Sequence, residues 1–471
     1  MLFNSFHYIA FFLTVLLAID TIRKGSLQHV LLLVASYYFY WASSSFHLLL
    51  LVYSSYLDFY CGRAIYRADS AGRRRLYLCL SLVGNLGVLA YFKYTNFAIS
   101  TAVLGLEALG WRPNVGTLEI FLPIGISFFT FQSMSYSLDI YFGRFKPVDS
   151  LKEFALYVAF FPQLVAGPIV RAREFLPQLV TPVRLNWENL KFGSTLILYG
   201  LVKKVCIADN LSGLVQGTFY GEPTHDTLIV FLGIVAFAVQ IYCDFSGYTD
   251  IAIGSARVLG FRFPDNFAHP YFSRNITEFW RRWHISLSSW LRDYLYIPLG
   301  GSRRGKRRQV ISLMITMLLG GLWHGAAWHF VIWGGFHGVL LVVHKYLLAE
   351  RRFLTHRLWT PMKILFTFYL TLIAWLIFII ADMSQLAFYI QKILFLDFQT
   401  AGLAALWAAR PFELILLGCF FAAHLVSYKV NHLSETFAGF RPVVWTAGAS
   451  ASLVLLYLLA PGQQSFIYFQ F

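Results

Sequence analysis

The sequence predicts an all-α, polytopic integral membrane protein, and three observations carry that prediction. Of its 471 residues, 58% are hydrophobic and only 13% are charged, with a mean hydropathy of +0.60. An ordinary soluble domain has about 25% charged residues. Apolar runs near the ~20 residues needed to cross hydrocarbon recur along the whole chain. Aromatic residues make up 18%, enough to form interfacial belts and also to line an internal cavity.

The apolar runs indicate the helices in chain order. Their ranges are 6–22, 29–41, 46–60, 76–99, 120–141, 154–170, 196–207, 227–242, 310–329, 331–348, 361–380, 386–396, 412–426 and 443–459. Several are too short to cross a bilayer alone, so we expect about 11 transmembrane helices plus re-entrant and interfacial helices. The first run lacks a basic start and a cleavage site, and is expected to remain as an anchor. Residues 1–471 are expected to form a single transmembrane domain.

The net charge of +15 is placed between apolar runs. The cations cluster at Arg23-Lys24, at 73–75, at Lys203-Lys204 and at 303–308. This arrangement is typical of loops on the cytoplasmic side, and it places the N-terminus outside. Membrane lipids with anionic headgroups are the expected partners of such loops, and nucleic acid is not. An alternative for 303–308 is attraction of an anionic donor.

The sequence lacks the motifs of several standard enzyme and metal-binding chemistries. The five cysteines are scattered without a CxxC pair, which fits neither a disulfide framework nor a zinc site. There is no GxSxG elbow, P-loop, HExxH or GxGxxG sequence. The spacing of His324, His329 and His337 forms no pair of ligands on one helix face. We therefore expect neither a metal nor a bound cofactor.

His324 follows Trp323 inside a stretch, 310–347, that is apolar enough to lie in a bilayer. A histidine at membrane depth is usually paired, lines a watery cavity or carries chemistry. A neutral imidazole accepts a proton near pH 7, so His324 is a candidate general base. The alternative is an interhelical hydrogen bond.

A second histidine, His284, closes the string Thr277-Glu278-Phe279-Trp280-Arg281-Arg282-Trp283-His284. One stripe of helical spacing contains Trp280, Trp283, Leu287, Trp290 and Tyr294. Such a stripe predicts a helix in the interface plane, with tryptophans at headgroup level and Arg281 and Arg282 outward. His284 lies one position beside the stripe and is expected to point into the protein.

Two carboxylates, Asp244 and Asp250, follow an apolar run in the segment 242–250. If buried, they need partners, and ion pairing with nearby arginines is the alternative to a catalytic role. Gly247 in this segment permits a close approach of backbone. Upstream, Pro123 and Gly125 interrupt another apolar run, and broken membrane helices commonly line cavities.

These strings occur together in a known family. The chain resembles the membrane-bound O-acyltransferases in YFKY at 91–94, PIGISF at 123–128, DFSGY at 244–248, EFWRRWH at 278–284 and GGLWHG at 320–325. It is most similar to the bacterial alginate O-acetyltransferase branch. The resemblance implies a ring of helices around a central tunnel, in a multi-pass protein of the bacterial inner membrane.

The resemblance also implies roles for residues. His324 matches the family's membrane-buried catalytic histidine, and His284 matches its second motif histidine. Residues that would support the tunnel or motifs are Trp323, Asp244, Ser246, Tyr248, Trp283, Arg281 and Arg282. The acyl donor would be acetyl-CoA or another thioester, meeting the acceptor in a fixed channel. The acceptor would be an exported polysaccharide or an extracytoplasmic acetyltransferase that passes the group on.

Two other functions stay open. The same fold serves the transfer of another acyl group, such as D-alanyl to teichoic acid. A transporter or flippase would use the intramembrane histidine to relay protons. Internally related halves, which many transporters show, are not detectable here.

Overall fold

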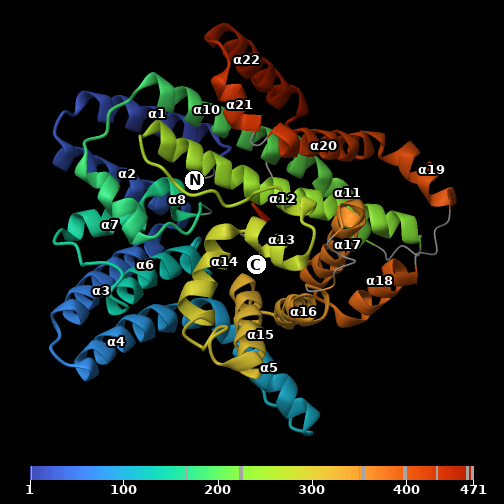
Figure 1. Cartoon of the computed structure of the whole chain (residues 1–471), viewed down its shortest axis with the longest axis horizontal. Coiled ribbons are helices and arrows are strands. Elements are labelled where there is room, and N and C mark those ends of the chain that lie inside the picture. Colours follow the sequence, from blue (N-terminus) through green and yellow to red (C-terminus); the bar gives the residue numbers. More distant parts are fainter. Residues whose placement is uncertain are drawn as a thin grey trace. The chain divides into compact units, whose positions relative to one another are not determined.

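The computed structural model describes residues 1, 3–165, 167–221, 226–349, 351, 356–395, 400–430, 433–462 and 466–467, and these contain helices but no strand. The α-helices are α1 (Phe6–Thr21), α2 (Gly25–Ser44), α3 (Leu48–Arg67), α4 (Ala71–Leu89), α5 (Thr95–Ala108), α6 (Ile126–Tyr141), α7 (Leu151–Ala159), α8 (Phe161–Leu164), α9 (Ala172–Phe175), α10 (Trp187–Leu201), α11 (Asp209–Phe219), α12 (Thr227–Val258), α13 (Ile276–Arg282), α14 (Ile285–Leu291), α15 (Gly305–His324), α16 (Trp328–Val343), α17 (Thr360–Ile379), α18 (Met383–Phe395), α19 (Thr400–Ala409), α20 (Pro411–Val430), α21 (Leu433–Gly439) and α22 (Pro442–Leu459) (Figure 1). The predicted all-α class is confirmed.

Shorter helical turns join several of these helices. π-helical turns cover Ala90–Tyr94, Val202–Ala208, Arg292–Tyr296 and His344–Leu348, and 3₁₀ turns cover Ser45–His47, Leu176–Val180, Pro270–Phe272 and Arg357–Trp359. π-helical turns inside helices occur frequently at functional sites. Two of them coincide with segments that the sequence singles out: Ala90–Tyr94 contains the YFKY string, and Val202–Ala208 contains Lys203-Lys204.

Six helices among the described residues are long and apolar enough to cross a membrane. They are Ala71–Ala108, Thr227–Val258, Trp328–Leu348, Thr360–Ile379, Pro411–Val430 and Pro442–Leu459. The helix Phe6–Thr21 is apolar but shorter. A single polypeptide with this many apolar helices is a multi-pass membrane protein, because each of them is long enough to cross the hydrocarbon.

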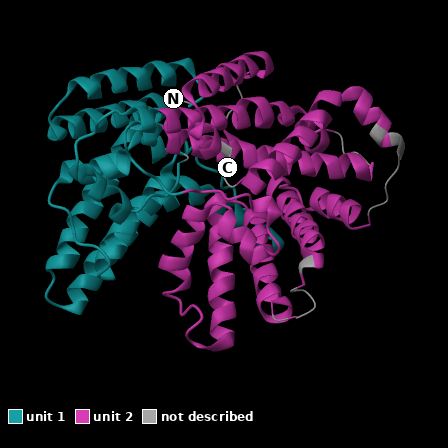
Figure 2. Cartoon of the chain, turned by 45° about the horizontal axis from the view of Figure 1, so that its top comes forward, with its two compact units in different colours: residues 1–190, 255–264 teal, residues 191–254, 265–471 magenta. Residues whose placement is uncertain are grey.

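The chain divides into two compact units by its internal contacts (Figure 2). Unit 1 comprises residues 1–190 and 255–264, and unit 2 comprises residues 191–254 and 265–471. Every residue assigned to the candidate site lies in unit 2. Whether 1–471 behaves as a single domain stays a prediction.

Unit 1 contains a fully buried carboxylate, Asp58 on α3. Ser137 Oγ on α6 and Asn85 Nδ2 on α4 each donate to it at 2.7 Å, and Ser81 and Ser133 donate as well. A buried charge without compensating hydrogen bonds would be costly. These four donors therefore satisfy Asp58 and tie α3, α4 and α6 together.

Unit 2 is built around an aromatic core in which Trp283, Trp333 and Trp375 are fully buried. The helices α15 and α16 lie side by side and α17 packs on α16 (Figure 1). Glycine makes the α15–α16 contact possible: a Cβ on Gly321 would lie 2.1 Å from the Phe330 carbonyl oxygen, and one on Gly334 2.2 Å from that of Met317. This close approach places the end of α15 against α16.

The prediction of one interfacial helix along the tryptophan stripe is wrong. α13 ends at Arg282, and a new helix, α14, begins at Ile285 because His284 adopts a left-handed backbone with φ 44°. Trp283 and Trp290 are 1% and 6% exposed, so the stripe packs inside the protein instead of at the headgroups. Helical spacing shows that one face of a helix is apolar, but it does not show whether protein core or lipid covers that face.

Candidate functional site

His324 is the last residue of α15 and is 4% exposed. Its imidazole lies among aromatic rings, with centroids 5.1 Å from Trp323, 5.0 Å from Trp333 and 5.7 Å from Phe378. The next residue, Gly325, leaves the helix in extended conformation. The structure therefore places this histidine at a helix end, inside an apolar and aromatic environment, as the sequence predicts.

His284 occupies the break between α13 and α14 and is fully buried. Its Nδ1 lies 3.2 Å from Asn266 Oδ1. The same oxygen accepts hydrogen bonds from the Ser286 backbone N–H at 3.1 Å and from Ser286 Oγ at 2.9 Å. The expectation that His284 points into the protein is confirmed.

Asn266 decides which nitrogen of His284 carries the proton. The backbone N–H of Ser286 can only donate, so the Asn266 atom that faces it is the oxygen. An amide oxygen only accepts, and the neighbouring His284 Nδ1 must therefore donate to it. The neutral ring then carries its proton on Nδ1 and presents Nε2 as an acceptor.

Trp323 lies against both histidines. Its ring centroid is 6.0 Å from that of His284 and 5.1 Å from that of His324, each edge to face. Phe245 closes the other side of His284 at 4.7 Å. The two candidate histidines thus belong to one aromatic cluster, assembled from α12, the α13–α14 junction and α15.

The carboxylates of α12 pair with lysines, where the sequence indicated arginines, which corrects that expectation. Lys204 Nζ lies 2.6 Å from Asp244 Oδ1 and 2.7 Å from Asp209 Oδ1. Lys203 pairs with Asp250 and donates to Ser246 Oγ at 3.0 Å. Buried ion pairs of this kind need partners on every side to offset their desolvation.

The prediction that Lys203 and Lys204 are loop cations is also wrong. They are 7% and 1% exposed, within the π-helical turn that follows α10. The turn approaches α12 closely because Gly247 has no side chain: a Cβ there would lie 2.7 Å from the Gly200 carbonyl oxygen. The predicted close backbone approach at Gly247 is confirmed.

The remaining motif residues pack around the cluster or anchor its helices. Tyr248 is 1% exposed, and its ring lies 4.3 Å from Phe466. Arg282 Nη2 donates to Glu278 Oε1 at 2.7 Å, which anchors α13. Arg281 is exposed. Trp283 packs on Trp375 with centroids 5.0 Å apart.

Glu278 remains ionised beside its arginines. Partial burial opposes ionisation, but hydrogen bonds from Arg274 and the nearby charge of Arg282 outweigh it and hold the pKa of Glu278 below its ordinary value. Arg274 Nε donates to Glu278 Oε2 at 2.9 Å. This ion-pair group begins the helix that leads to His284.

Two residues of the site are not predictable from the sequence pattern. Asn266 stands in a polar segment, Pro264-Asp265-Asn266, with no motif to single it out. Trp333 lies nine residues beyond His324, where the spacing of apolar residues gives it no distinction. Only the fold brings both of them against the histidines.

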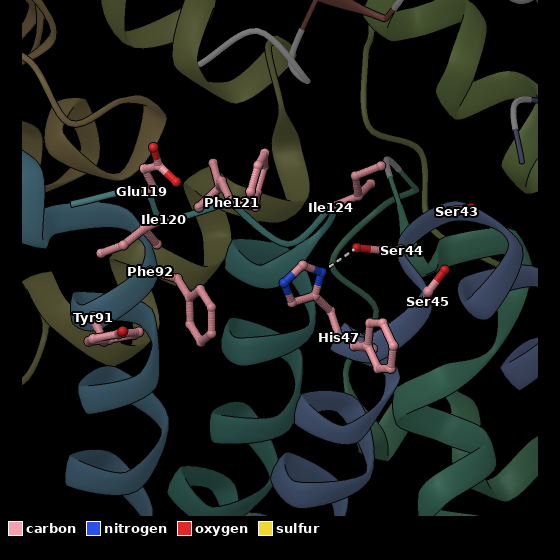
Figure 3. A pocket seen from close by; sticks show the side chains of 12 residues that line it. Ser43, Ser44, Ser45, His47, Tyr91, Phe92, Glu119, Ile120, Phe121 and Ile124 are labelled. Atoms are coloured by element: carbon pink, nitrogen blue, oxygen red, sulfur yellow. Dashed lines mark hydrogen bonds between the residues drawn. The ribbon is translucent and has the colours of Figure 1, made fainter.

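The broken helix at 122–128 lines a cavity, as predicted. α6 begins at Ile126 after Gly125, which adopts a left-handed φ of 75°. Leu122 and Ile124 line a cavity of about 620 Å³ within unit 1. Figure 3 shows His47 facing Ser44 in this cavity, with Phe92 beside the ring, and His47 Nδ1 lies 2.8 Å from Ser44 Oγ.

The fold and the site define a class before any comparison is made. The chain is a multi-pass helical membrane protein in which two buried histidines share one aromatic cluster with a paired lysine–carboxylate group beside it. Such a site suits proton transfer away from bulk water.

Comparison with known proteins places the chain within that class. A model of the membrane-bound O-acyltransferase family matches residues 147–385, and the chain belongs to this family. It is therefore an O-acyltransferase. Both histidines lie within the matched range.

Relatives support this assignment over most of the chain. A probable alginate O-acetylase of Azotobacter vinelandii is 42% identical over 383 residues, 80% of this chain and 75% of the relative. A probable alginate O-acetylase of Pseudomonas putida is 36% identical and covers 100% of both chains. A peptidoglycan O-acetyltransferase of Helicobacter pylori is 37% identical over 64% of this chain and 62% of its own.

Proposed function

We propose that the enzyme moves an acetyl group from a cytoplasmic thioester donor across the bacterial inner membrane for O-acetylation of an exported, alginate-like polysaccharide. The observation that carries this is the aromatic cluster, which holds two buried histidines on either side of Trp323. The relatives named for O-acetylation of alginate and peptidoglycan support the acetyl group and the glycan acceptor.

In the proposed mechanism, His324 is the general base. Its neutral imidazole takes the proton of the acceptor hydroxyl as that oxygen attacks the carbonyl carbon of the thioester. The carbon–sulfur bond then breaks, and the departing thiolate takes the proton from the imidazolium. His284, held by Asn266, directs Nε2 toward the reacting groups. Acetyl-CoA or another acyl thioester serves as donor and is consumed as a substrate.

The same proposal includes the architecture that the resemblance implies. About 11 crossings arranged as a ring around a central tunnel would let donor and acceptor meet end to end. The acceptor would be the polysaccharide itself or an extracytoplasmic acetyltransferase that passes the group on. Because the chain belongs to the acyltransferase family, we do not propose a transporter or flippase function.

The test compares His324→Ala with the wild type in membranes that contain equal amounts of protein. Transfer of labelled acetyl to polymer should fall roughly 10²- to 10⁴-fold, the usual contribution of a general base. His329→Ala is the matched control, because His329 is also buried but faces Phe330 on α16. Wild-type acetylation by His324→Ala at normal abundance would contradict the catalytic assignment.

A second candidate is transfer of D-alanyl to teichoic acid. A teichoic acid D-alanyltransferase of Streptococcus thermophilus is 28% identical over 53% of this chain. Assays with acetyl and D-alanyl thioesters side by side separate the two functions. We favour acetyl because the relatives named for O-acetylation are more similar and cover more of the chain.

A further inference from the structure

A cleft in unit 1 has a composition that the acyl-transfer site does not explain. It has a volume of about 790 Å³ and lies where α3 ends and α4 begins, beside the start of α7. Its lining includes Arg63, Arg67 and Arg73, together with the rings of Tyr60 and Tyr77. Three guanidinium groups from two helices thus converge on one concave surface.

Two of these arginines lack a partner. Arg63 is held in place, since its Nη1 donates to the Asp149 carbonyl oxygen at 3.2 Å and its guanidinium lies 5.2 Å from the Phe59 ring centroid. Arg67 and Arg73 are exposed, and no ion pair or hydrogen bond engages either guanidinium group within the described residues. Arg73 also stands in the first turn of α4, where the helix dipole disfavours a cation.

The cleft also contains acidic groups. Asp69 and Asp149 line it beside the three arginines, which leaves a formal charge of +1 (three minus two). Asp149 is fully exposed at the rim and pairs with Arg63 at 3.8 Å. With Arg63 paired to Asp149, the two remaining arginines, Arg67 and Arg73, outweigh the single remaining carboxylate, Asp69, and the cleft keeps a net positive charge.

Apolar stripes continue from the cleft along both helices. Tyr53, Tyr56 and Tyr60 follow one face of α3 with 43%, 52% and 51% of their surface exposed, and Leu76, Leu80 and Val83 follow one face of α4 with 55%, 50% and 70% exposed. Spacings of three and four residues keep each stripe on one side of its helix. In a membrane protein such exposed apolar stripes face lipid chains.

We propose that this cleft binds the headgroup phosphate of an anionic glycerophospholipid, whose acyl chains lie along the exposed stripes of α3 and α4. Arginine guanidinium groups match phosphate oxygens in geometry and charge. Basic clefts between helices on the cytoplasmic side are suited to such headgroups. The arginine-rich end of α3 is the cytoplasmic end by the positive-inside bias.

Two features favour a lipid over a free anion. The cationic lining is continuous with apolar surface on both helices, which a soluble phosphate compound would leave exposed to hydrocarbon. The aromatic rings of Tyr60 and Tyr77 flank the cations, as they do where a headgroup meets acyl chains. The proposal is independent of the function proposed above.

The test measures lipid bound to the full-length protein by native mass spectrometry. Wild-type protein should retain phosphatidylglycerol in preference to phosphatidylcholine offered at the same mole fraction. The Arg67→Gln/Arg73→Gln variant should bind phosphatidylglycerol roughly 25-fold more weakly, about fivefold for each arginine. Arg67→Lys/Arg73→Lys, which keeps both charges, should recover part of that binding.

The control removes two cations elsewhere in unit 1. Arg23→Gln/Lys24→Gln should bind phosphatidylglycerol like the wild type, because neither residue lines the cleft. Equal loss in this control, or equal retention of phosphatidylcholine by the wild type, overturns the proposal. Inorganic phosphate should displace no more lipid than chloride does at matched ionic strength. Selective displacement by phosphate would assign the cleft to a free anion instead.

Discussion

Asn266 Oδ1 accepts from His284 Nδ1 at 3.2 Å and also from two groups of Ser286. The hydrogen bond links a loop residue to a histidine whose own backbone is in the left-handed region, at φ 44°. Left-handed backbone costs a non-glycine residue roughly 1–2 kcal/mol and persists only when its surroundings enforce it. Asn266 is one of the groups that enforce it, and it also selects the tautomer.

Asn266→Ala should lower kcat roughly ten- to hundredfold, because a buried donor left without its acceptor costs about 1–3 kcal/mol. Asn266→Asp keeps an acceptor oxygen but adds a negative charge that favours the imidazolium form. Its pH–activity profile should therefore move its acidic limb toward higher pH. Steady-state kinetics across pH separates the two variants. An unchanged profile in Asn266→Asp would show that this contact has no influence on the state of His284.

His284→Gln and His284→Ala separate a positional role from proton transfer. Glutamine keeps hydrogen bonding but is not a base near neutral pH. If His284 positions substrate or the helix break, His284→Gln should keep substantial turnover and His284→Ala should lose it. If it transfers a proton, both should fail alike while the protein remains folded. Full activity in both variants would leave His324 as the only catalytic histidine.

Lys204→Met should destabilise the protein strongly, because it leaves Asp244 and Asp209 buried without their cation. Breaking a buried ion pair on one side costs roughly 3–5 kcal/mol. Thermal unfolding in detergent reports the loss. Combining Lys204→Met with Asp244→Asn and Asp209→Asn removes all three charges and should recover part of the melting temperature. A triple variant as unstable as Lys204→Met alone would show that charge is not the cause.

Charge reversal at Arg303, Arg304 and Lys306 tests whether the exposed loop before α15, together with the first turn of that helix, captures an anionic donor. The apparent donor KM should rise steeply with kcat little changed, and added salt should weaken capture in the wild type more than in the variant. Reversal of Arg23 and Lys24 is the matched control for a change of topology. Unchanged donor kinetics would mean that the loop only orients the protein in the membrane.

The membrane class, the helical fold and the burial of the two histidines follow from local sequence. Apolar runs of near-spanning length need no tertiary context, because each helix satisfies its own backbone in hydrocarbon. The burial of His324 is visible in the same way, since the whole stretch around it is apolar. The break at Gly125 is local as well, because a proline and a glycine interrupt one run.

The partners of charged residues were not predictable in this way. Lys203 and Lys204 have the pattern of loop cations, but a π-helical turn against Gly247 buries them beside the carboxylates of α12. The stripe of Trp283 has the spacing of an interfacial helix, and only the break at His284 turns it into core. The residues next to Asn266 in the sequence give no indication of its contact with His284.

The sequence by itself therefore determined the membrane class, the helices and the burial of the two candidate histidines. The tertiary structure alone decided which groups meet: Asn266 with His284, Trp323 with both histidines, and Lys204 with Asp244. The physical reason is that hydropathy and helical period are properties of neighbouring residues. A hydrogen bond or buried ion pair depends on how distant segments pack, and close packing accepts few arrangements.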